Sequence, residues 1–164
     1  MEVRRIQKGQ GMLLRDVRLK ALTESPFAFG AKFSDEEITP LKEFEKKADL
    51  HATSEVSTTF FAFDEKTVVG QIGAFIDKSD NAFICAMWVS PSNRRKGIGK
   101  KLVKVAVAWL YQQDHNEVFA WVSDENTTAK AFYKSNGFIA TNTQQPLPSS
   151  ANISETLYVI TKHG

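Results

Sequence analysis

A passage from a buried strand into an amphipathic helix restricts the fold of this chain more than any other sequence feature. The almost wholly apolar run Ala82–Val89 predicts a strand buried on both faces, and Pro91 ends it. After Gly97 and Gly99, apolar residues recur at helical spacing along one stripe, formed by Ile98, Leu102, Val105, Ala106 and Trp109. A strand that leads directly into such a helix predicts a domain of mixed α/β class.

Hydrophobic periodicity predicts further strands and helices on both sides of this segment. The predicted strands are residues 3–6, 58–63, 68–76, 82–89, 117–122, 138–141 and 155–160. The predicted helices are residues 12–24, ended by Pro26, a second through 41–48, a third from 98, and a fourth over 129–133, ended by Gly137. Ser34 and Glu37 form a capping-box pattern ahead of the second helix. The polar segment 142–152, with Pro146 and Pro148, predicts a long loop.

Length, cysteine content and charge narrow the class of protein. The chain of 164 residues suits one domain over 1–164, and no apolar run approaches the ~20 residues that a membrane-spanning helix needs. No signal core follows the N-terminus and Cys85 is the only cysteine, so we expect a cytoplasmic protein without internal disulfides. The isolated residues His51, His115 and His163 predict no metal site. A net charge of +2 is too small to indicate a nucleic-acid partner.

The loop before the third helix has the chemistry of an anion-binding site. A helix start exposes unpaired backbone N–H groups, and Gly97 and Gly99 let the backbone approach a phosphate closely. Basic side chains gather around it at Arg94, Arg95, Lys96, Lys100, Lys101 and Lys104. A basic turn without a ligand would show the same pattern. A Walker A loop does not fit, because Lys101 follows Gly99-Lys100, and a dinucleotide fingerprint does not fit, because Leu102 replaces its third glycine.

Two motifs resemble those of the GNAT superfamily of acetyl-CoA-dependent N-acyltransferases. Residues 94–99 match the signature Arg/Gln-x-x-Gly-x-Gly/Ala, and residues 87–91 resemble the strand end that precedes it. Residues 126–138 match the second pattern, Asn-x-x-Ala-x-x-Phe-Tyr-x-x-x-Gly-Phe, at every named position. The resemblance covers about residues 56 to 141. It implies a fold of α/β (α+β) class with a mixed, mostly antiparallel central sheet of six to seven strands, flanked by about four helices.

The resemblance also implies acetyl-CoA (coenzyme A) as the cosubstrate and assigns a site to it. Amides from Arg95 to Lys100 would hold the pyrophosphate, and the backbone near Met87 and Val89 would pair with the pantetheine arm as an added strand. The implied coenzyme contacts are Met87, Trp88, Val89, Arg94, Arg95, Lys96, Gly97, Ile98, Gly99, Lys100, Asn126, Phe132 and Tyr133. Tyr133 is the implied catalytic residue, which protonates the departing thiolate.

Several roles at this site have simpler structural interpretations. Asn126 could cap a helix, Phe132 is favoured as a core residue, and Cys85 is predicted to be a small buried hydrophobe rather than a nucleophile. An N–H group near Val89 could stabilise the oxyanion that forms on attack by an amine. A base must deprotonate that amine, and none of the candidate carboxylates is assigned: Glu24, Asp35, Glu36, Glu37, Asp77 and Asp124.

The implied reaction is acetyl transfer to a primary amine of a small molecule or protein. A small amine such as a polyamine ranks first, ahead of an aminoglycoside-like drug, an amino acid, or a protein N-terminus or lysine. The family places its acceptor site at residues 12–50 and 142–152, where Phe27, Phe29 and Phe33 could line a pocket. The alternatives are a non-catalytic acetyl-CoA sensor on the same fold and a small nucleic-acid-binding module. Homodimers are common in the family, but no residue pattern specifies an interface here.

Overall fold

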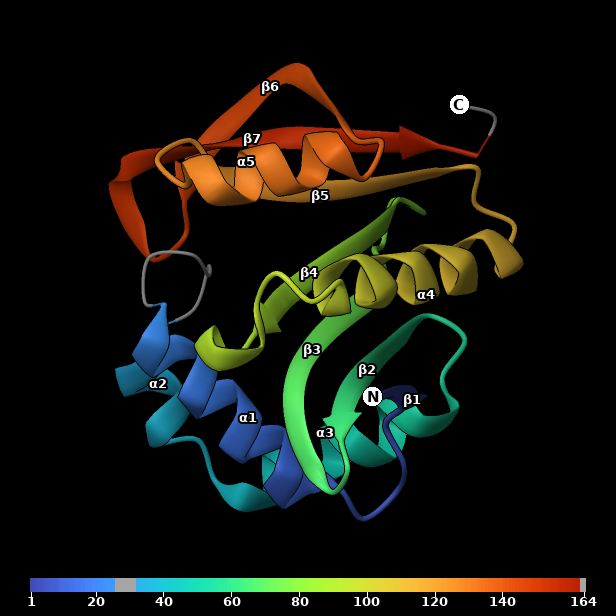
Figure 1. The fold of residues 1–164 in the computed structure, drawn as a ribbon, viewed down its shortest axis with the longest axis vertical. Helices are drawn as coiled ribbons and strands as arrows, with labels where there is room; N and C mark the ends of the chain where they lie inside the picture. Colours follow the sequence, from blue (N-terminus) through green and yellow to red (C-terminus); the bar gives the residue numbers. More distant parts are fainter. Residues whose placement is uncertain (26–31, 163–164) are drawn as a thin grey trace.

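The computed structural model describes residues 1–25 and 32–162, and it contains one mixed sheet (Figure 1). Its seven strands lie in the order β1-β2-β3-β4-β5-β7-β6. The strands are β1 Glu2–Arg5, β2 Ser57–Asp64, β3 Thr67–Ile76, β4 Ala82–Val89, β5 Glu117–Ser123, β6 Ile139–Leu147 and β7 Ser150–Thr161. The helices are α1 Gly11–Glu24, α2 Phe33–Glu37, α3 Leu41–Thr53, α4 Ile98–Gln112 and α5 Thr127–Ser135, with a 3-10 turn at Pro91–Asn93. The predicted residues Pro26, Phe27, Phe29 and His163 lie outside the described part.

The predicted fold class is confirmed. Neighbouring strands pair antiparallel throughout the sheet except for β4 and β5, which are parallel. The long α4 joins these two parallel strands, as a parallel connection requires. None of the described helices has both the length and the apolar composition to cross a bilayer.

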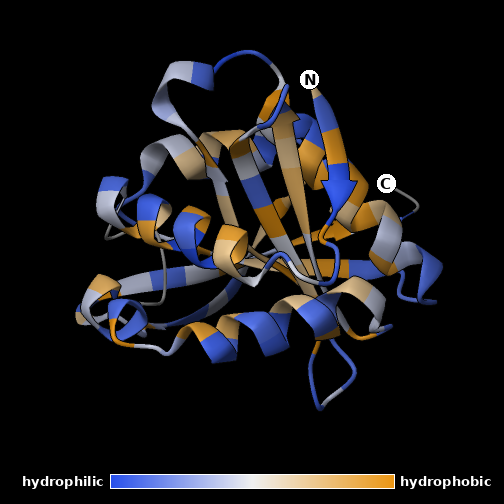
Figure 2. Cartoon of the chain, turned by 90° about the horizontal axis from the view of Figure 1, so that it is seen from below, coloured by the Kyte–Doolittle hydropathy of each residue, from blue (hydrophilic) through white to orange (hydrophobic). Residues whose placement is uncertain are grey.

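Two hydrophobic layers hold the helices to opposite faces of the sheet. On one face, α4 and α5 pack on alternate residues of the central strands, such as Ile72 and Val118. On the other face, α1 and α3 pack on residues that include Phe61 and Trp88. Figure 2 shows the apolar residues along the strands and on the helix surfaces that face them. Each fully buried aliphatic or aromatic side chain contributes about 1.5–3 kcal/mol, so these layers dominate the stability of the fold.

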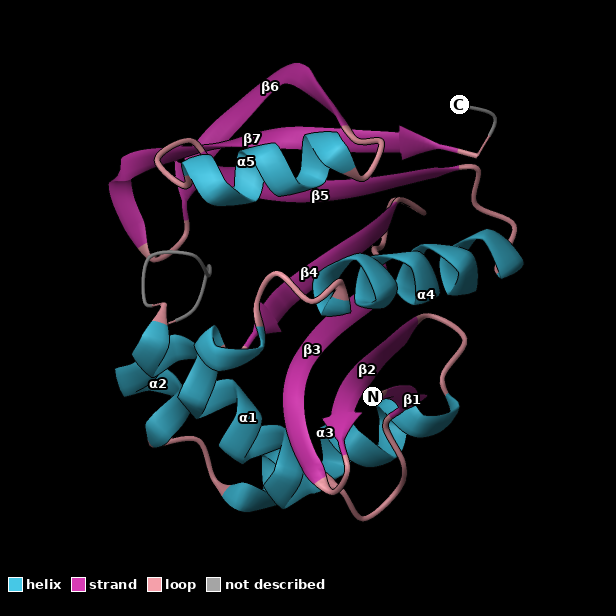
Figure 3. Cartoon of the chain, in the orientation of Figure 1, coloured by secondary structure: helices cyan, strands magenta, loops and turns pink. Residues whose placement is uncertain are grey.

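The predicted loop over residues 142–152 is wrong, because most of this segment forms the hairpin of β6 and β7 (Figure 3). Gln144 pairs with Thr156, and Leu147 pairs with Ser150 across a short turn. The segment is polar because β6 is the edge strand of the sheet and exposes most of its residues. Pro146 is compatible with this position, since an edge strand tolerates a missing backbone donor.

The predicted capping box at Ser34 and Glu37 is also wrong. Ser34 lies inside the short helix α2, whose N-cap is Lys32 and which has no side-chain cap. The second predicted helix starts separately at Leu41, after Pro40 at its N-cap position. Proline has a fixed φ and no N–H group, so it breaks the segment into two helices rather than one.

The prediction that strand β4 is buried on both faces is wrong, because the face that carries Cys85 is open in the middle of the strand. Ala82, Ile84 and Trp88 are buried, whereas Cys85 is exposed and Met87 is half-buried. A register shift opposite Gln71 and Gly73, with Ala86 at a φ of 52°, bends the strand at this point. The open face of β4 becomes part of a cleft.

An ion pair between residues that do not line this cleft gives the stability of the protein a predictable pH dependence. His115 Nε2 lies 2.9 Å from Asp80 Oδ1, which joins the α4–β5 loop to the β3–β4 turn. Burial lowers the pKa of His115, but hydrogen bonds to Asp80 and Gln113 raise it above its usual value overall. The stabilisation is therefore fully present below the ordinary histidine pKa of about 6.5, and it is lost as the pH rises through the raised value.

We expect Asp80→Asn to lower the free energy of unfolding by about 0.5–1 kcal/mol below pH 6 and by less above pH 8. Asn is the appropriate substitution because it tolerates the positive φ of 63° at this position. Urea titrations of both proteins at the two pH values measure the difference. An equal loss at both pH values would contradict a contribution from protonated His115.

Candidate active site

The two parallel strands at the centre of the sheet diverge and leave a gap. β4 and β5 pair only at Ala82↔Val118 and Phe83↔Phe119, after which β5 continues with β7 as its sole partner up to Ser123. The gap widens toward the carboxyl ends of both strands (Figure 1). It forms part of a cleft of about 1410 Å³ whose lining residues come from both faces of the sheet.

The backbone of Val89 supplies hydrogen-bonding groups at the open end of the gap. The Ser90 N–H donates to the Val69 carbonyl across β3 at 2.8 Å, so by alternation the N–H and carbonyl of Val89 point away from β3. The Val89 carbonyl accepts a hydrogen bond of 2.9 Å from Arg94 Nε. The Val89 N–H therefore faces the gap, where an extended ligand could add to β4 as a strand.

The glycine loop ends at the uncapped start of α4. Gly97 is the N-cap of the helix with a φ of 79°, and no side chain caps the first turn. The first N–H groups of α4 are therefore available to an anion in the cleft, which Gly97, Gly99 and Lys100 line. A Cβ at Gly99 would lie 2.9 Å from Met87 Cε and 3.1 Å from the Phe132 ring, so a larger residue there would require both side chains to shift.

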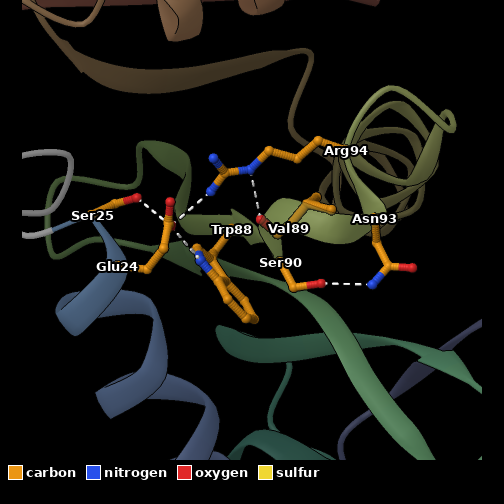
Figure 4. Close-up of polar contacts among 7 residues, drawn as sticks. All are labelled: Glu24, Ser25, Trp88, Val89, Ser90, Asn93 and Arg94. Atoms are coloured by element: carbon orange, nitrogen blue, oxygen red, sulfur yellow. Dashed lines mark hydrogen bonds and ion pairs between the residues drawn. The ribbon is translucent and has the colours of Figure 1, made fainter.

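The side chain of Arg94 already has protein partners (Figure 4). Its Nη2 lies 2.7 Å from Glu24 Oε2, which also accepts a hydrogen bond of 3.0 Å from Trp88 Nε1 and one from the Ser25 hydroxyl. Burial opposes the ionisation of Glu24, but the hydrogen bonds from Ser25, Arg94 and Trp88 outweigh it and lower its pKa overall. Arg94 thus links the end of β4 to the end of α1 through its contacts with Val89 and Glu24. Its predicted contact with the coenzyme stays a prediction.

The other predicted basic contacts differ in position. Arg95 and Lys100 line the cleft, whereas Lys96 does not. Arg95 has a φ of 63°, so the loop takes a left-handed conformation at this residue as well as at Gly97. Trp88 and Ile98 are buried, and the Trp88 ring packs on the α1 side of the sheet. A coenzyme contact from either of these buried side chains therefore stays a prediction.

Helix α5 carries the second motif along the other side of the cleft. Asn126 caps the helix, because its side chain accepts a hydrogen bond of 3.0 Å from the Ala129 N–H. Gly137, with a φ of 92°, ends it in a Schellman motif, in which the Phe138 N–H donates to the Tyr133 carbonyl at 3.0 Å. Phe132 packs against the core, as favoured from the sequence, and also lines the cleft.

Tyr133 places a hydroxyl group in the cleft. Its ring lies between Phe132 and Phe138, with 5.3 Å between ring centroids on each side, and only 8% of the residue is exposed. No described residue forms a hydrogen bond with the hydroxyl, which reaches the cleft surface. Burial, and to a smaller extent the nearby Cys85, raise the pKa of Tyr133. The hydroxyl therefore keeps its proton at neutral pH.

The prediction that Cys85 is a buried hydrophobe is wrong, because this residue is exposed in the cleft. Its sulfur faces Gly73, where a Cβ would come within 2.8 Å of it. The sequence suggested burial because the whole run is apolar, but β5 no longer lies beside β4 beyond Phe83. The surrounding protein desolvates the thiol and raises its pKa, although Lys47 and Arg18 act in the opposite direction.

Sequence reasoning missed Glu155 of β7. This residue is 5% exposed and is the only carboxylate among the described residues that line the cleft. Its Oε1 accepts a hydrogen bond of 2.6 Å from Gln145 Nε2. Burial raises its pKa, a rise that the Gln145 hydrogen bond reduces and the nearby Asp124 increases. The signal available in the sequence was an acidic residue at the start of the mostly apolar predicted strand 155–160.

The left-handed conformation at Gly97 can be tested by substitution. A Cβ at this position would meet no atom within 4 Å, so a substitution strains only the backbone. We expect Gly97→Ala to lower the free energy of unfolding by about 1–2 kcal/mol. Gly97→Asn should lose less, because Asn tolerates this conformation. Urea titrations compare the two variants, and equal losses would contradict backbone strain as the cause.

Comparisons with known proteins are consistent with this geometry. Residues 19–138 match the model of the "Acetyltransferase (GNAT) family". Over 69 residues the chain is 33% identical to the peptidyl-lysine N-acetyltransferase YiaC of Escherichia coli (strain K12). That alignment covers 42% of this chain and 44% of the relative, which is less than half of either protein.

Solved structures share the fold at low sequence identity. An acetyltransferase of the GNAT family from Streptococcus pneumoniae superposes with a TM-score of 0.80 at 16% identity, over 98% of both chains. The putative streptothricin acetyltransferase from Bacillus anthracis str. Ames, in complex with acetyl coenzyme A, has a TM-score of 0.61 at 18% identity. That match covers 68% of this chain and 65% of the other. Because the family model spans most of the chain, including both motifs, the protein belongs to the GNAT acetyltransferase family.

Proposed function

We propose that this protein transfers the acetyl group of acetyl-CoA to an amine by direct attack in a ternary complex. The observation that carries the proposal is the gap between β4 and β5, which opens beside the uncapped start of α4. The gap suits an extended arm, and the helix start suits a pyrophosphate. The Bacillus anthracis neighbour in complex with acetyl coenzyme A adds support.

The main chain does most of the proposed coenzyme binding. Amides between Arg95 and Lys100 would hold the pyrophosphate, with the basic side chains of these two residues nearby. The Val89 N–H would bond the pantetheine arm or the thioester oxygen, on which negative charge develops during attack. Acetyl-CoA supplies the activated acyl group, and the protein positions it and excludes water.

Tyr133 is the proposed proton donor to the departing thiolate. Its hydroxyl reaches the cleft without a protein partner, and its raised pKa keeps it protonated at neutral pH. A proton donor close to the leaving group contributes typically 10²–10⁴-fold to a rate.

We expect Tyr133→Phe to lower turnover by about 10²-fold while acetyl-CoA raises the melting temperature of both proteins by similar amounts. Thiol release over a panel of amines measures turnover, and thermal unfolding with acetyl-CoA measures binding. Tyr111→Phe is the matched control, because Tyr111 lies on α4 and does not line the cleft. Equal turnover of Tyr133→Phe and the unmodified protein would remove Tyr133 from the mechanism.

The same pair of measurements separates the enzyme from a non-catalytic sensor. A sensor would gain thermal stability from acetyl-CoA but release no thiol with any amine. An absence of any thermal shift at millimolar acetyl-CoA would contradict both functions.

Glu155 is the proposed acceptor of the proton that the amine must lose. It is a buried carboxylate at the cleft surface, and its raised pKa makes it a stronger base than an ordinary glutamate. Glu155 pairs with Ser123 of β5, so the two side chains share one face of the sheet. Phe119 and Trp121, which precede Ser123 on β5 at alternate positions, lie on the same face. The proton would move directly or through one water molecule.

We expect Glu155→Gln to lower kcat/KM by about 10²-fold at neutral pH and to remove the low-pH limb of the rate profile. A carboxyl pKa raised by folding makes its charged form unfavourable, so stability falls as the pH rises through that pKa. The variant should therefore melt no lower than the unmodified protein at pH 7. Glu125→Gln, an exposed change outside the cleft, is the control. An unchanged pH profile would contradict the proposed role.

A further inference from the structure

The cleft continues from the gap onto the face of the sheet that carries α1 and α3. Strand pairing places Thr59 of β2 opposite Gly73 of β3, and Phe61 opposite Gln71, so these side chains share that face. Helix α3, which packs on this face, contributes Lys47 and His51. We call the polar part of this surface the basic end of the cleft, and its lining residues are Arg18, Lys47, His51, Thr59 and Gln71.

Gln71 is the most informative residue of the basic end. It is only 2% exposed, yet its side chain has no hydrogen-bond partner among the described residues. No buried side-chain nitrogen or oxygen there is completely enclosed without a partner, so its carboxamide must reach the cleft surface. A nearly buried amide that reaches only the cleft surface is available to a ligand that hydrogen-bonds to it there.

Positive charge dominates the basic end. Lys47 is exposed on α3 and has no ion-pair or hydrogen-bond partner within residues 1–25 and 32–162. Arg18 of α1 lies 3.5 Å from Glu36 and adds further positive charge at the surface. The only carboxylate among the described cleft-lining residues, Glu155, comes from β7, beyond the gap between β4 and β5.

His51 contributes a polar ring rather than a charge. Its Nδ1 lies 2.9 Å from the Thr59 hydroxyl, which fixes the ring against β2. Burial, with smaller effects of Lys47 and Arg5, lowers the pKa of His51 to about 4. The ring is therefore neutral at neutral pH, and Lys47 remains the unpaired cation of this surface.

An apolar surface adjoins the basic end. Phe75 follows Gly73 by two positions on the same face of β3, and its ring stacks on Phe83 with 5.3 Å between centroids. Both rings are half-buried and line the cleft. A ligand that lies along β3 would thus meet an amide at Gln71, the Cys85 thiol beside Gly73, and aromatic rings at Phe75 and Phe83.

We propose that the acceptor carries a carboxylate as well as the reacting amine, and that Lys47 and Gln71 bind this carboxylate. The inference rests on the proposed acetyl transfer and names its acceptor class: an amino acid with an apolar side chain, which would lie on Phe75 and Phe83. A carboxylate offers acceptors to both the ammonium and the amide donor. A polyamine, which ranked first from the sequence, would place further positive charge beside Lys47 and Arg18.

The test uses two stable probes that resemble the product, N-acetyl-L-phenylalanine and its amide, N-acetyl-L-phenylalaninamide. The two differ only at the carboxyl group, which is a charged acceptor in the acid and a neutral carboxamide in the amide. Equilibrium titrations in the presence of coenzyme A measure both affinities. We expect the acid to bind at least about tenfold more tightly than the amide, as one charge-assisted contact provides.

Variants connect this preference to the named residues. Lys47→Ala should weaken binding of the acid about tenfold and leave the amide unchanged. Lys42→Ala, an exposed change on the same helix outside the cleft, should alter neither affinity. Gln71→Met should weaken the acid without lowering the melting temperature, because it removes an unpartnered amide, whereas a purely structural role would lower it.

The outcomes separate this inference from the proposed function. If coenzyme A stabilises the protein but the two probes bind with equal affinity, or the acid does not bind, the acceptor assignment alone is overturned. No stabilisation by coenzyme A would contradict the proposed function. A preference for the acid that persists without coenzyme A, and disappears in Lys47→Ala, would still support the carboxylate site.

Discussion

The early divergence of β4 from β5 is the constraint on which the rest of this structure depends. Two paired positions hold the strands together at one end, and beyond Phe83 no described strand pairs with β4 on that side. An unpaired strand edge is usually a liability. Here the ion pair of Arg94 with Glu24 and the hydrogen bond of Arg94 to Val89 fix the free end, so the gap is held open by protein contacts.

The groups around this gap are those that the fold leaves unsatisfied. The Tyr133 hydroxyl and the Gln71 amide have no described partner although both residues are largely buried. Burial raises the pKa of Glu155, and the first turn of α4 has no cap. Each feature is explained by a ligand in the cleft that completes it. They lie along one cleft that passes from the α4 side of the sheet to the α3 side.

The sequence predicted what depends on local patterns. The amphipathic stripe of α4, the Asn126 cap and the left-handed stop at Gly137 follow from short-range spacing, and the structure confirms all three. The errors concern long-range contacts. Exposure of Cys85 depends on where β5 diverges, the strand character of residues 142–152 depends on pairing with β7, and Glu155 became a candidate only when pairing brought β7 beside β5.

The central claim is that this gap and the start of α4 together form the coenzyme site. A crystal structure of the protein with coenzyme A tests it most directly. The account predicts the pyrophosphate within hydrogen-bond distance of amides between Arg95 and Lys100, with the pantetheine arm alongside β4 at Val89. A pyrophosphate bound elsewhere, or an arm that does not enter between β4 and β5, would contradict it.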